Sequence, residues 1–494
     1  MINRHFLRKP SFWGILAPAR VALLLFALSF SLQVRSQAAE DYQSEDSTQL
    51  SPEEQVMIGR VFLMGNKRTQ ERIIRRELSF TEGETWGKEL LIEALELDKR
   101  KLANLRLFNT VELDLAPVNK NTVDVVVRVT ERWYVWPSVI FQLSDRSFNE
   151  WWFNQNHDFS RIEYGGGLDW YNVRGANERL SIKAQLGFNK KLRFSYKFPY
   201  IDEAQITGLS LESSYTTSNW INHRSIDNRQ DFMSSEDIIY SDLYMAATLS
   251  RRPDYYNTHY LKVSYNNRTI GDTVALANPD FFLDGATQQQ FFRISYQLTH
   301  DQRDVFAYPL DGKFWEVGIH QQGLGLVSNF HRTQLYSTYA QYWPLKEKLF
   351  VASRTSGHLS FPEKQPYNLF QTLGYGRDFV RGYELQVIEG QHFFLNKTNL
   401  KYRLLRQRID LGRLMPLSQF RQIPIDIYLK TYFDQGYVWN SLPYEDNQRL
   451  INRYLFGTGL GLDIVTFYDA VLRIEYSRNR EGDWAFYYGF RADL

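Results

Sequence analysis

The chain has 494 residues, 58 of them basic and 56 acidic, with a formal net charge of +2 and no cysteine. This charge balance excludes the basic excess of a nucleic-acid-binding protein, and the lack of cysteine excludes disulfides, thiolate metal sites and an acylated-cysteine lipid anchor. Aromatic residues make up 16% of the chain. Beyond the amino terminus there is no apolar run of about 20 residues, which a membrane-spanning helix needs. Aromatic girdles are typical of outer-membrane β-barrels, so the composition favours that class over a soluble enzyme.

The amino terminus has the pattern of a secretory signal. Basic residues precede an apolar run over residues 21–32, and the small residues of Ser36-Gln37-Ala38 follow at plausible cleavage positions. We predict a signal peptide over residues 1–38, in preference to a membrane anchor. A polar linker is expected over residues 39–55.

Residues 56–132 have the pattern of a small α/β domain. A β-rich run ends at the turn dipeptide Gly65-Asn66, and Thr69 is placed to cap a following helix. A second helix then presents one apolar stripe, and two runs of alternating apolar residues follow near positions 111–115 and 123–129. The predicted order is β-α-α-β-β, with a three-stranded sheet.

The remainder, residues 133–494, consists of period-2 runs separated by polar or glycine-containing segments. An even number of such strands, each with one apolar and one polar face, is typical of a bacterial outer-membrane barrel. We therefore predict a mainly β protein with a 16-stranded antiparallel transmembrane β-barrel. The sixteen runs begin near Trp133, Arg161, Leu180, Arg193, Thr207, Asp242, His259, Gln289, Gly312, Phe330, Leu349, His392, Ile425, Tyr454, Val471 and Trp484.

Loop lengths give an orientation. Barrels of this class have short periplasmic turns and long outer loops. If residues 56–132 are periplasmic, most long connections fall outside; they are residues 144–160, 216–241, 268–288, 360–391 and 434–453. The exception is the long, arginine-bearing segment 405–423, predicted on the periplasmic side without an assigned role.

Two short motifs occur about fifty residues apart in the barrel region. They are Val380-Arg381-Gly382-Tyr383 and Tyr432-Phe433-Asp434-Gln435-Gly436. Together with the β-α-α-β-β segment, which resembles a POTRA domain, they make the chain similar to the BamA/TamA-like outer-membrane assembly superfamily. The chain resembles a short, single-POTRA member of this bacterial surface antigen family. An unrelated small α/β domain of the same order is the alternative for residues 56–132.

The resemblance implies that the loop bearing Arg381, Gly382 and Tyr383 folds into the barrel lumen, where the arginine meets Asp434 beside Gly436. Strand parity places Asp434 on the polar, luminal face. A guanidinium can bind a carboxylate bidentately, and Gly382 removes a side chain that would obstruct the approach. The alternative is a surface arginine in a mobile outer loop.

We call the expected contact of the Arg381 loop with Asp434 the luminal lock. One departure from the family pattern concerns this lock. Lys401 stands on the twelfth strand where the family often has an acidic residue, and parity places it in the lumen. A lysine there is expected to repel Arg381. The lock is then expected to use Glu384 or Asp378 instead.

Two further features match the family. Asp301, Arg303, Asp304, Pro309 and Gly312 occupy the predicted periplasmic turn between strands eight and nine. The barrel seam is expected between the first strand, from Trp133, and the last strand, from Trp484 to Leu494. The last strand carries an aromatic, lipid-facing pattern.

No enzyme motif is found. The histidines are scattered, there is no His-x-x-Glu-His or Gly-x-Ser-x-Gly, and Gly457, Gly459 and Gly461 alternate on a strand in a way that permits close backbone packing. We expect no catalytic residue, no metal site and no cofactor. A barrel lipase is the less favoured alternative.

The resemblance implies a function. It is assistance in assembly or insertion of barrel proteins, or translocation of polypeptides, at the bacterial outer membrane without ATP, with the POTRA-like domain in the periplasm. The implied partners are outer-membrane lipids, unfolded or nascent β-barrel clients, and periplasmic or lipoprotein subunits, with no nucleic acid. An open sheet edge of the POTRA-like domain suits β-augmentation by a client. The alternatives are a non-insertase structural subunit of an outer-membrane complex and, less favoured, a diffusion channel.

Overall fold

The computed structural model describes residues 55–489 except 147, 328–329, 411, 413–421 and 467–469. The expected signal peptide, the linker up to residue 54, and Leu494 lie outside the described residues. Among the helices of the described part, none combines the length and the apolar character needed to cross a membrane.

The amino-terminal domain is a small sheet with two helices. Its elements are β1 Gln55–Met64, α2 Glu71–Arg75, β2 Thr85–Gly87, α3 Lys88–Asn104, β3 Phe108–Asn119 and β4 Thr122–Glu131. The predicted order is confirmed, with one addition. The sheet has the order β2-β1-β4-β3, so the short strand β2 makes it four-stranded and partly covers the β1 edge. The core is formed by residues such as Ile58, Leu91 and Val125, each 0% exposed.

The prediction that Thr69 caps the first helix is wrong. The capping position of α2 is Gln70, which makes no side-chain capping bond. The Thr69 hydroxyl instead donates to Glu131 Oε1 at 2.6 Å, and the Thr69 backbone N–H donates to the same oxygen at 2.7 Å. Hydrogen bonds to a carboxylate are stronger than those between neutral groups. These two bonds therefore connect the segment before α2 to the end of β4.

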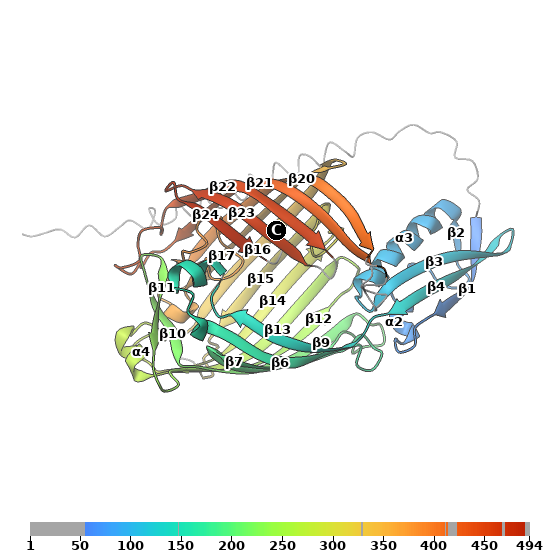
Figure 1. Ribbon diagram of the computed structural model, residues 1–494. Helices are drawn as coiled ribbons and strands as arrows, with labels where there is room; N and C mark the ends of the chain where they lie inside the picture. The colour runs from blue at the N-terminus through green and yellow to red at the C-terminus, as the bar shows by residue number, and fades with distance from the viewer. Residues whose placement is uncertain are drawn as a thin grey trace, which may run out of the picture. The chain divides into compact units, whose positions relative to one another are not determined.

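The barrel domain is one antiparallel sheet in which the strands follow each other in sequence order. The predicted sixteen strands are confirmed, and Figure 1 shows how strongly the sheet curves. Their bounds are β5 Val135–Leu143, β6 Ile162–Tyr171, β7 Arg179–Gly187, β8 Asn189–Phe198, β9 Thr207–Ser218, β12 Tyr240–Arg251, β13 Asn257–Ile270, β14 Gln288–Asp301, β15 Gly312–Gln322, β16 Arg332–Lys346, β17 Leu349–Phe361, β20 His392–Asp410, β21 Gln422–Trp439, β22 Tyr454–Thr466, β23 Val471–Asn479 and β24 Trp484–Gly489.

The two faces of this sheet have the reverse polarity of a soluble protein. On β21 the apolar side chains of Leu429 and Phe433 are each 44% exposed, whereas Lys430 and Asp434 are 1% and 0% exposed. Apolar residues therefore face outward and charged residues face the enclosed interior. This is the pattern of a transmembrane β-barrel, because only the outer face contacts lipid.

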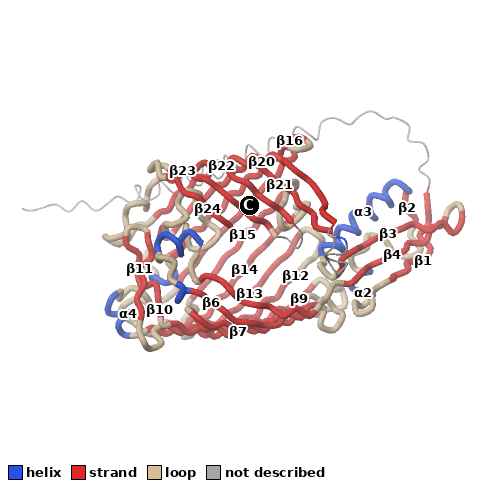
Figure 2. The backbone as a smooth tube through the Cα atoms, viewed as in Figure 1, coloured by secondary structure: helices blue, strands red, loops and turns tan. Residues whose placement is uncertain are grey.

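Short elements occupy the outer connections, which the sequence analysis treated as loops. They are the π-helix Glu150–Asn154 and the 3-10 helix Phe159–Arg161 between β5 and β6, the hairpin β10 Trp220–Ile226 with β11 Arg229–Ser234, the helix α4 Asp272–Ala277, a 3-10 helix Tyr367–Leu369, and the small pair β18 Gln371–Leu373 with β19 Ile388–Glu389. The hairpin and α4 lie at the same end of the barrel strands (Figures 1 and 2). They share a small hydrophobic core that includes Ile221, Ile239, Val274 and Phe281. Burial of these side chains explains why the two outer connections fold against each other.

The arginine-bearing segment 405–423 is not one loop. Strand β20 continues to Asp410 and β21 begins at Gln422, and Arg406 pairs with Asp426 in the register of the two strands. The sequence analysis ended β20 too early because Arg406 and Arg408 interrupt the apolar alternation. The centre of the predicted loop, residues 413–421, lies outside the described residues.

The seam strands β5 and β24 are the two ends of the sheet. Within the described ranges, β5 pairs only with β6 and β24 only with β23. The side chain of Asn149, in the connection after β5, donates to the backbone carbonyl of Phe486 on β24. Trp133 precedes β5 and is 66% exposed, and Trp484 begins β24 on its outward face.

Candidate luminal lock

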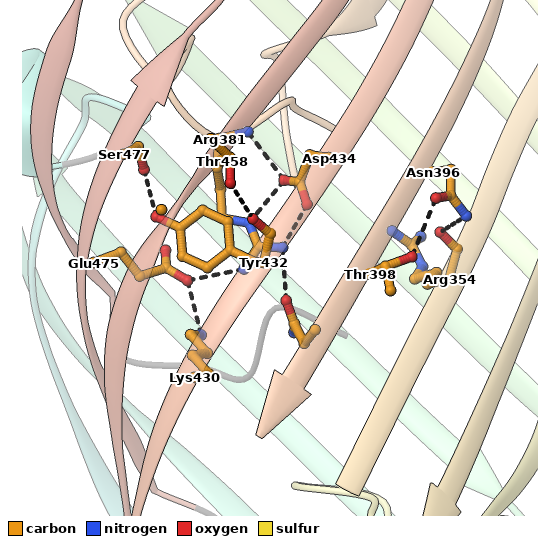
Figure 3. A network of polar contacts seen from close by, with 12 residues as sticks. Arg354, Arg381, Asn396, Thr398, Lys430, Tyr432, Asp434, Thr458, Glu475 and Ser477 are labelled. Carbon is orange, nitrogen blue, oxygen red and sulfur yellow. Dashed lines mark hydrogen bonds and ion pairs between the residues drawn. The ribbon is translucent and has the colours of Figure 1, made fainter. Parts of the chain in front are cut away.

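The loop between β17 and β20 places Arg381 against the barrel wall. The guanidinium Nε donates to Asp434 Oδ2 at 2.7 Å, Nη2 donates to Asp434 Oδ1, and the Arg381 backbone N–H donates to Oδ2 at 3.1 Å. Both side chains are 0% exposed. Figure 3 shows this two-pronged contact reaching β21 from the loop. The structure thus brings together the two residues that the sequence motifs singled out.

Three further wall residues surround the same guanidinium. Nη1 lies 3.2 Å from Glu475 Oε1 on β23, and Nη2 donates to Asn399 Oδ1 on β20 at 2.7 Å. The guanidinium carbon lies 3.7 Å from the centre of the Tyr432 ring, which adds a cation-π contact. The arginine therefore joins the loop to three wall strands, β20, β21 and β23.

The sequence analysis did not find Asn399 or Glu475 as members of the site. Parity on β20 and β23 places both in the lumen, but parity gives no information about which luminal residues lie at the height of the loop. The second carboxylate of the lock stands on β23 and not on the twelfth strand, where the family resemblance led us to look.

Two glycines allow the loop to approach the wall this closely. Gly382 has a φ of +93°, and its carbonyl accepts from Asn479 Nδ2 at 3.1 Å. At Gly457 on β22 a Cβ atom would lie 1.7 Å from the carbonyl oxygen of Arg381. A side chain at either position is incompatible with the observed backbone.

The hydrophobic side of the loop is equally buried. Val380 and Tyr383 are 1% and 2% exposed and belong to a cluster with residues of β20, β21 and β22. The Tyr383 hydroxyl donates to Glu481. At Gly436 a Cβ atom would lie 2.7 Å from Val380 Cγ2, so this motif glycine makes room for the loop valine. The loop is held by packing as well as by charge.

Comparison with known protein families shows to which family the chain belongs. The Omp85 superfamily domain matches residues 172–478, which include both lock motifs. The chain belongs to the Omp85 superfamily. In this Omp85 chain, residues 56–132 match the POTRA domain described as a surface antigen variable number repeat. The family and POTRA resemblances inferred from the sequence are confirmed.

Solved structures agree on the fold of the Omp85 chain. BamA from Haemophilus ducreyi lacking POTRA domains 1-3 is similar with a TM-score of 0.53 at 16% identity, covering 88% of this chain and 83% of that one. CdiB from Escherichia coli is similar with a TM-score of 0.52 at 13% identity, covering 88% of this chain and 75% of that one. No curated protein was found to match the sequence.

The three expected modulators of the Omp85 lock have different roles. The Glu384 carboxylate accepts from the Gly382 backbone N–H at 2.9 Å, and burial raises the pKa of this loop carboxyl to about 7. Asp378 accepts from the guanidinium of Arg354 on β17 at 3.0 Å. Lys401 faces the lumen as predicted, but its ammonium lies 4.1 Å from the centre of the Tyr308 ring.

A second set of buried charges continues from the lock. Lys430 on β21 lies 2.8 Å from Glu475 and 2.8 Å from Asp463 on β22, and all three side chains are 0% exposed. Buried charges are costly unless they are paired, and here each carboxylate shares a cation with a neighbour. Figure 3 shows Lys430 beside Glu475 on the side opposite Asp434.

The residues of the β14–β15 turn motif stabilise the turn itself. Arg303 Nε donates to Asp301 Oδ1 at 2.8 Å, and Asp304 Oδ1 accepts from the backbone N–H of Leu310 at 3.1 Å. Gly312 has a φ of +98°, and a Cβ atom there would lie 2.1 Å from the Gln302 carbonyl oxygen. Pro309, in the same turn, is buried.

A second buried carboxylate, Glu389, organises the outer connections. It is 1% exposed and accepts from the hydroxyls of Ser225, Tyr367 and Tyr375. Its other oxygen accepts from Asn447 Nδ2 at 2.9 Å. Four donors from three separate outer segments therefore meet at one side chain, which the sequence analysis did not single out.

The arrangement offers binding and positioning of the loop. Among the residues that the structure describes, no group of three or more His, Cys, Asp or Glu side chains is placed to hold a metal ion. What the site can do chemically is to hold a loop inside a membrane barrel and to release it when the charges are separated.

Proposed function

We propose that this chain assists the insertion of β-barrel proteins into the bacterial outer membrane, or moves polypeptides across it, without ATP. The observation that carries the proposal is an Omp85 barrel, joined to a POTRA domain, that holds a motif-bearing loop against its inner wall. On this reading the chain is no enzyme. Its work is done by backbone edges and by a loop that can be docked or released.

Two exposed sheet edges suit such a role. In lipid, an unpaired backbone N–H or C=O is costly, so an entering strand needs a partner edge. In the described part of the seam strand β24, six residues pair with β23, and Asn149 donates to the carbonyl of Phe486. In the POTRA domain, β3 is an edge strand with β4 on one side, which suits β-augmentation by an extended client.

The proposed partners follow from these surfaces. Outer-membrane lipids contact the apolar outer face, unfolded or nascent barrel clients pair with the strand edges, and periplasmic or lipoprotein subunits bind in the periplasm. The clients are recognised through backbone hydrogen bonds, so the sequence requirement on them is weak.

Depletion of the protein, followed by quantitative profiling of the outer membrane, tests the proposal. Broad loss of barrel proteins or of surface-exported polypeptides is the expected result, and restoration should require Arg381. Complementation with Arg381→Ala is compared with Arg377→Ala, an exposed arginine in the same loop. Loss of a single partner protein identifies a structural complex subunit, and altered solute uptake alone identifies a diffusion channel. Either of these outcomes overturns the proposal.

Copurification from intact membranes addresses the partners. Cross-linkers placed on β24 and on β3 are expected to capture barrel clients in an unfolded or partly folded form. Capture of only one folded protein at both edges contradicts a role in assembly or translocation.

A further inference from the structure

The β14–β15 turn sends one side chain across the barrel interior. Tyr308 is 5% exposed, and its hydroxyl donates to Asp463 Oδ2 on β22 at 2.8 Å. In the sheet order, β16, β17, β20 and β21 lie between β15 and β22. The contact therefore does not follow the wall; it crosses the space that the wall encloses.

The Tyr308 ring packs against residues of other wall strands. Its centre lies 4.9 Å from the ring of Tyr428, and both belong to a cluster with Phe350 and Val471. The Lys401 ammonium lies 4.1 Å from the same ring. A buried phenol with an apolar body and a satisfied hydroxyl is a specific anchor.

The turn that carries this anchor is preorganised. The Arg303–Asp301 pair and the positive φ of Gly312 fix its two ends, and the Arg303 guanidinium lies 4.5 Å from the Phe314 ring. Tyr308 is thus presented by a rigid support, and little conformational entropy is lost when it docks.

A continuous set of buried polar contacts leads from Tyr308 to the lock. Asp463 lies 2.8 Å from Lys430, and Lys430 lies 2.8 Å from Glu475. Glu475 lies 3.2 Å from the Arg381 guanidinium. Asp463 and Glu475 therefore share the Lys430 ammonium, and Glu475 also has Arg381 and, at 3.6 Å, Arg473 beside it, so the position of each charge depends on the next.

We propose that the β14–β15 turn is a second docked element of the barrel interior, and that Tyr308 is a positioning residue for the Arg381 loop. The Tyr308 hydroxyl satisfies part of Asp463 and leaves Lys430 to balance Glu475. Without that hydroxyl, Asp463 competes for Lys430. Glu475 keeps Arg473 at 3.6 Å but holds Lys430 less tightly, so it draws the guanidinium of Arg381 away from Asp434, and the loop loosens.

This coupling explains why an inner turn and an outer loop carry sequence motifs in the same barrel. Undocking of the turn at one mouth weakens the lock that holds the loop near the other mouth. By thermodynamic linkage, release of the loop must weaken the docking of the turn by the same factor. The inference goes beyond the proposed function, because it concerns equilibria of the isolated barrel and requires no client.

Cysteine labelling measures both equilibria, since the chain has no cysteine of its own. The reporters are Val387→Cys in the loop, where the valine is 0% exposed, and Ala307→Cys in the turn. The purified full chain in detergent micelles is labelled with a maleimide, and barrel folding is checked by heat-modifiable electrophoretic mobility.

Tyr308→Phe removes only the hydroxyl and is expected to raise the labelling rate of the Val387→Cys reporter by ~2-fold to ~30-fold, the range of coupling in packed networks. The matched control is Tyr336→Phe, which removes a luminal hydroxyl that donates to Gln297 at 2.9 Å on another part of the wall. The control is expected to leave the labelling rate unchanged. An equal effect of the two variants overturns the proposal.

The double variant Tyr308→Phe with Arg381→Ala separates coupling from independent damage. Coupling predicts that Tyr308→Phe adds nothing to the labelling rate once the arginine is gone, whereas effects that multiply overturn the proposal. The reciprocal measurement does not depend on the folding of any Tyr308 variant. Arg381→Ala is expected to raise labelling of the Ala307→Cys reporter, and an unchanged rate there also overturns the coupling.

Discussion

Two buried carboxylates hold loops in this barrel by different means. Asp434 meets a guanidinium in a bidentate contact, whereas Glu389 meets four neutral donors from three outer segments. An ion pair in a dry site depends on both charges, because removal of one leaves the other buried and uncompensated. A carboxylate among neutral donors depends mainly on the donors being in place. The lock should therefore be destabilised most by loss of a charge. The cluster around Glu389 should be destabilised most by displacement of its donors.

The largest effect is expected at the lock. Arg381→Ala or Asp434→Ala breaks a buried pair and should cost about 3–5 kcal/mol of unfolding free energy. The measurement is thermal unfolding in micelles, read by heat-modifiable mobility, together with protease resistance of the loop. Arg377→Ala is the matched control. If both lock variants resist heat and protease like the parent and remain active, the lock has no structural role.

A smaller effect is expected where the loop backbone meets the wall. Gly457→Ala places a methyl group against the Arg381 carbonyl, and overpacking of this kind costs about 1–3 kcal/mol. Gly376→Ala is the control, because a Cβ atom at that loop position meets nothing within 4 Å. The same unfolding measurement should separate the two variants; equal stability contradicts the close approach.

The comparison itself is sharpened by two isosteric changes. Asp434→Asn removes the charge that faces a guanidinium, whereas Glu389→Gln keeps an acceptor for the three hydroxyls and loses one bond, worth about 0.5–1.5 kcal/mol. We expect Asp434→Asn to lower the unfolding temperature more than Glu389→Gln does. The reverse order contradicts the distinction between the two carboxylates.

The smallest effect concerns pH. Burial raises the pKa of Glu384 from its ordinary value of 4.5 to about 7. Because the pKa of Glu384 is higher in the folded state than in the unfolded state, its protonated form favours folding. This stability is fully present below pH 4.5 and is lost as the pH rises through 7. The unfolding temperature should therefore fall between pH 5.5 and 8 by less in Glu384→Gln than in the parent. An identical fall in both proteins contradicts the assignment.

Sequence pattern predicted the fold well for a physical reason. A barrel strand must alternate because lipid lies on one side and the lumen on the other, so each of the sixteen strands carries its own local signal. The same parity placed Asp434 and Lys401 in the lumen. Parity gave no depth along the strand and no angle around the barrel. It therefore missed Glu475 and Asn399, which contact the Arg381 guanidinium, and Tyr308, which contacts Asp463.

The errors have similar causes. Thr69 stands where a helix cap is expected, but its hydroxyl donates to Glu131 at the end of β4, and Gln70 occupies the capping position. The three-stranded sheet missed β2 because a strand of three residues has no period to detect. The segment 405–423 was read as a loop because its arginines break the alternation, although pairing between β20 and β21 continues as far as Asp410 and Gln422.

The length of that hairpin has a consequence for the membrane surface. Strand β20 has 19 residues and β21 has 18. At a rise of about 3.4 Å per residue β20 is about 60 Å long. A strand tilted by about 45° needs only about 9–11 residues to cross the hydrocarbon. The two strands thus outrun the bilayer and stand in the aqueous phase as a paired ribbon, with Arg406 and Arg408 exposed on it. A movement of the barrel wall at this point is carried beyond the lipid by this ribbon, across the irregularity of pairing between Arg403 and Leu405.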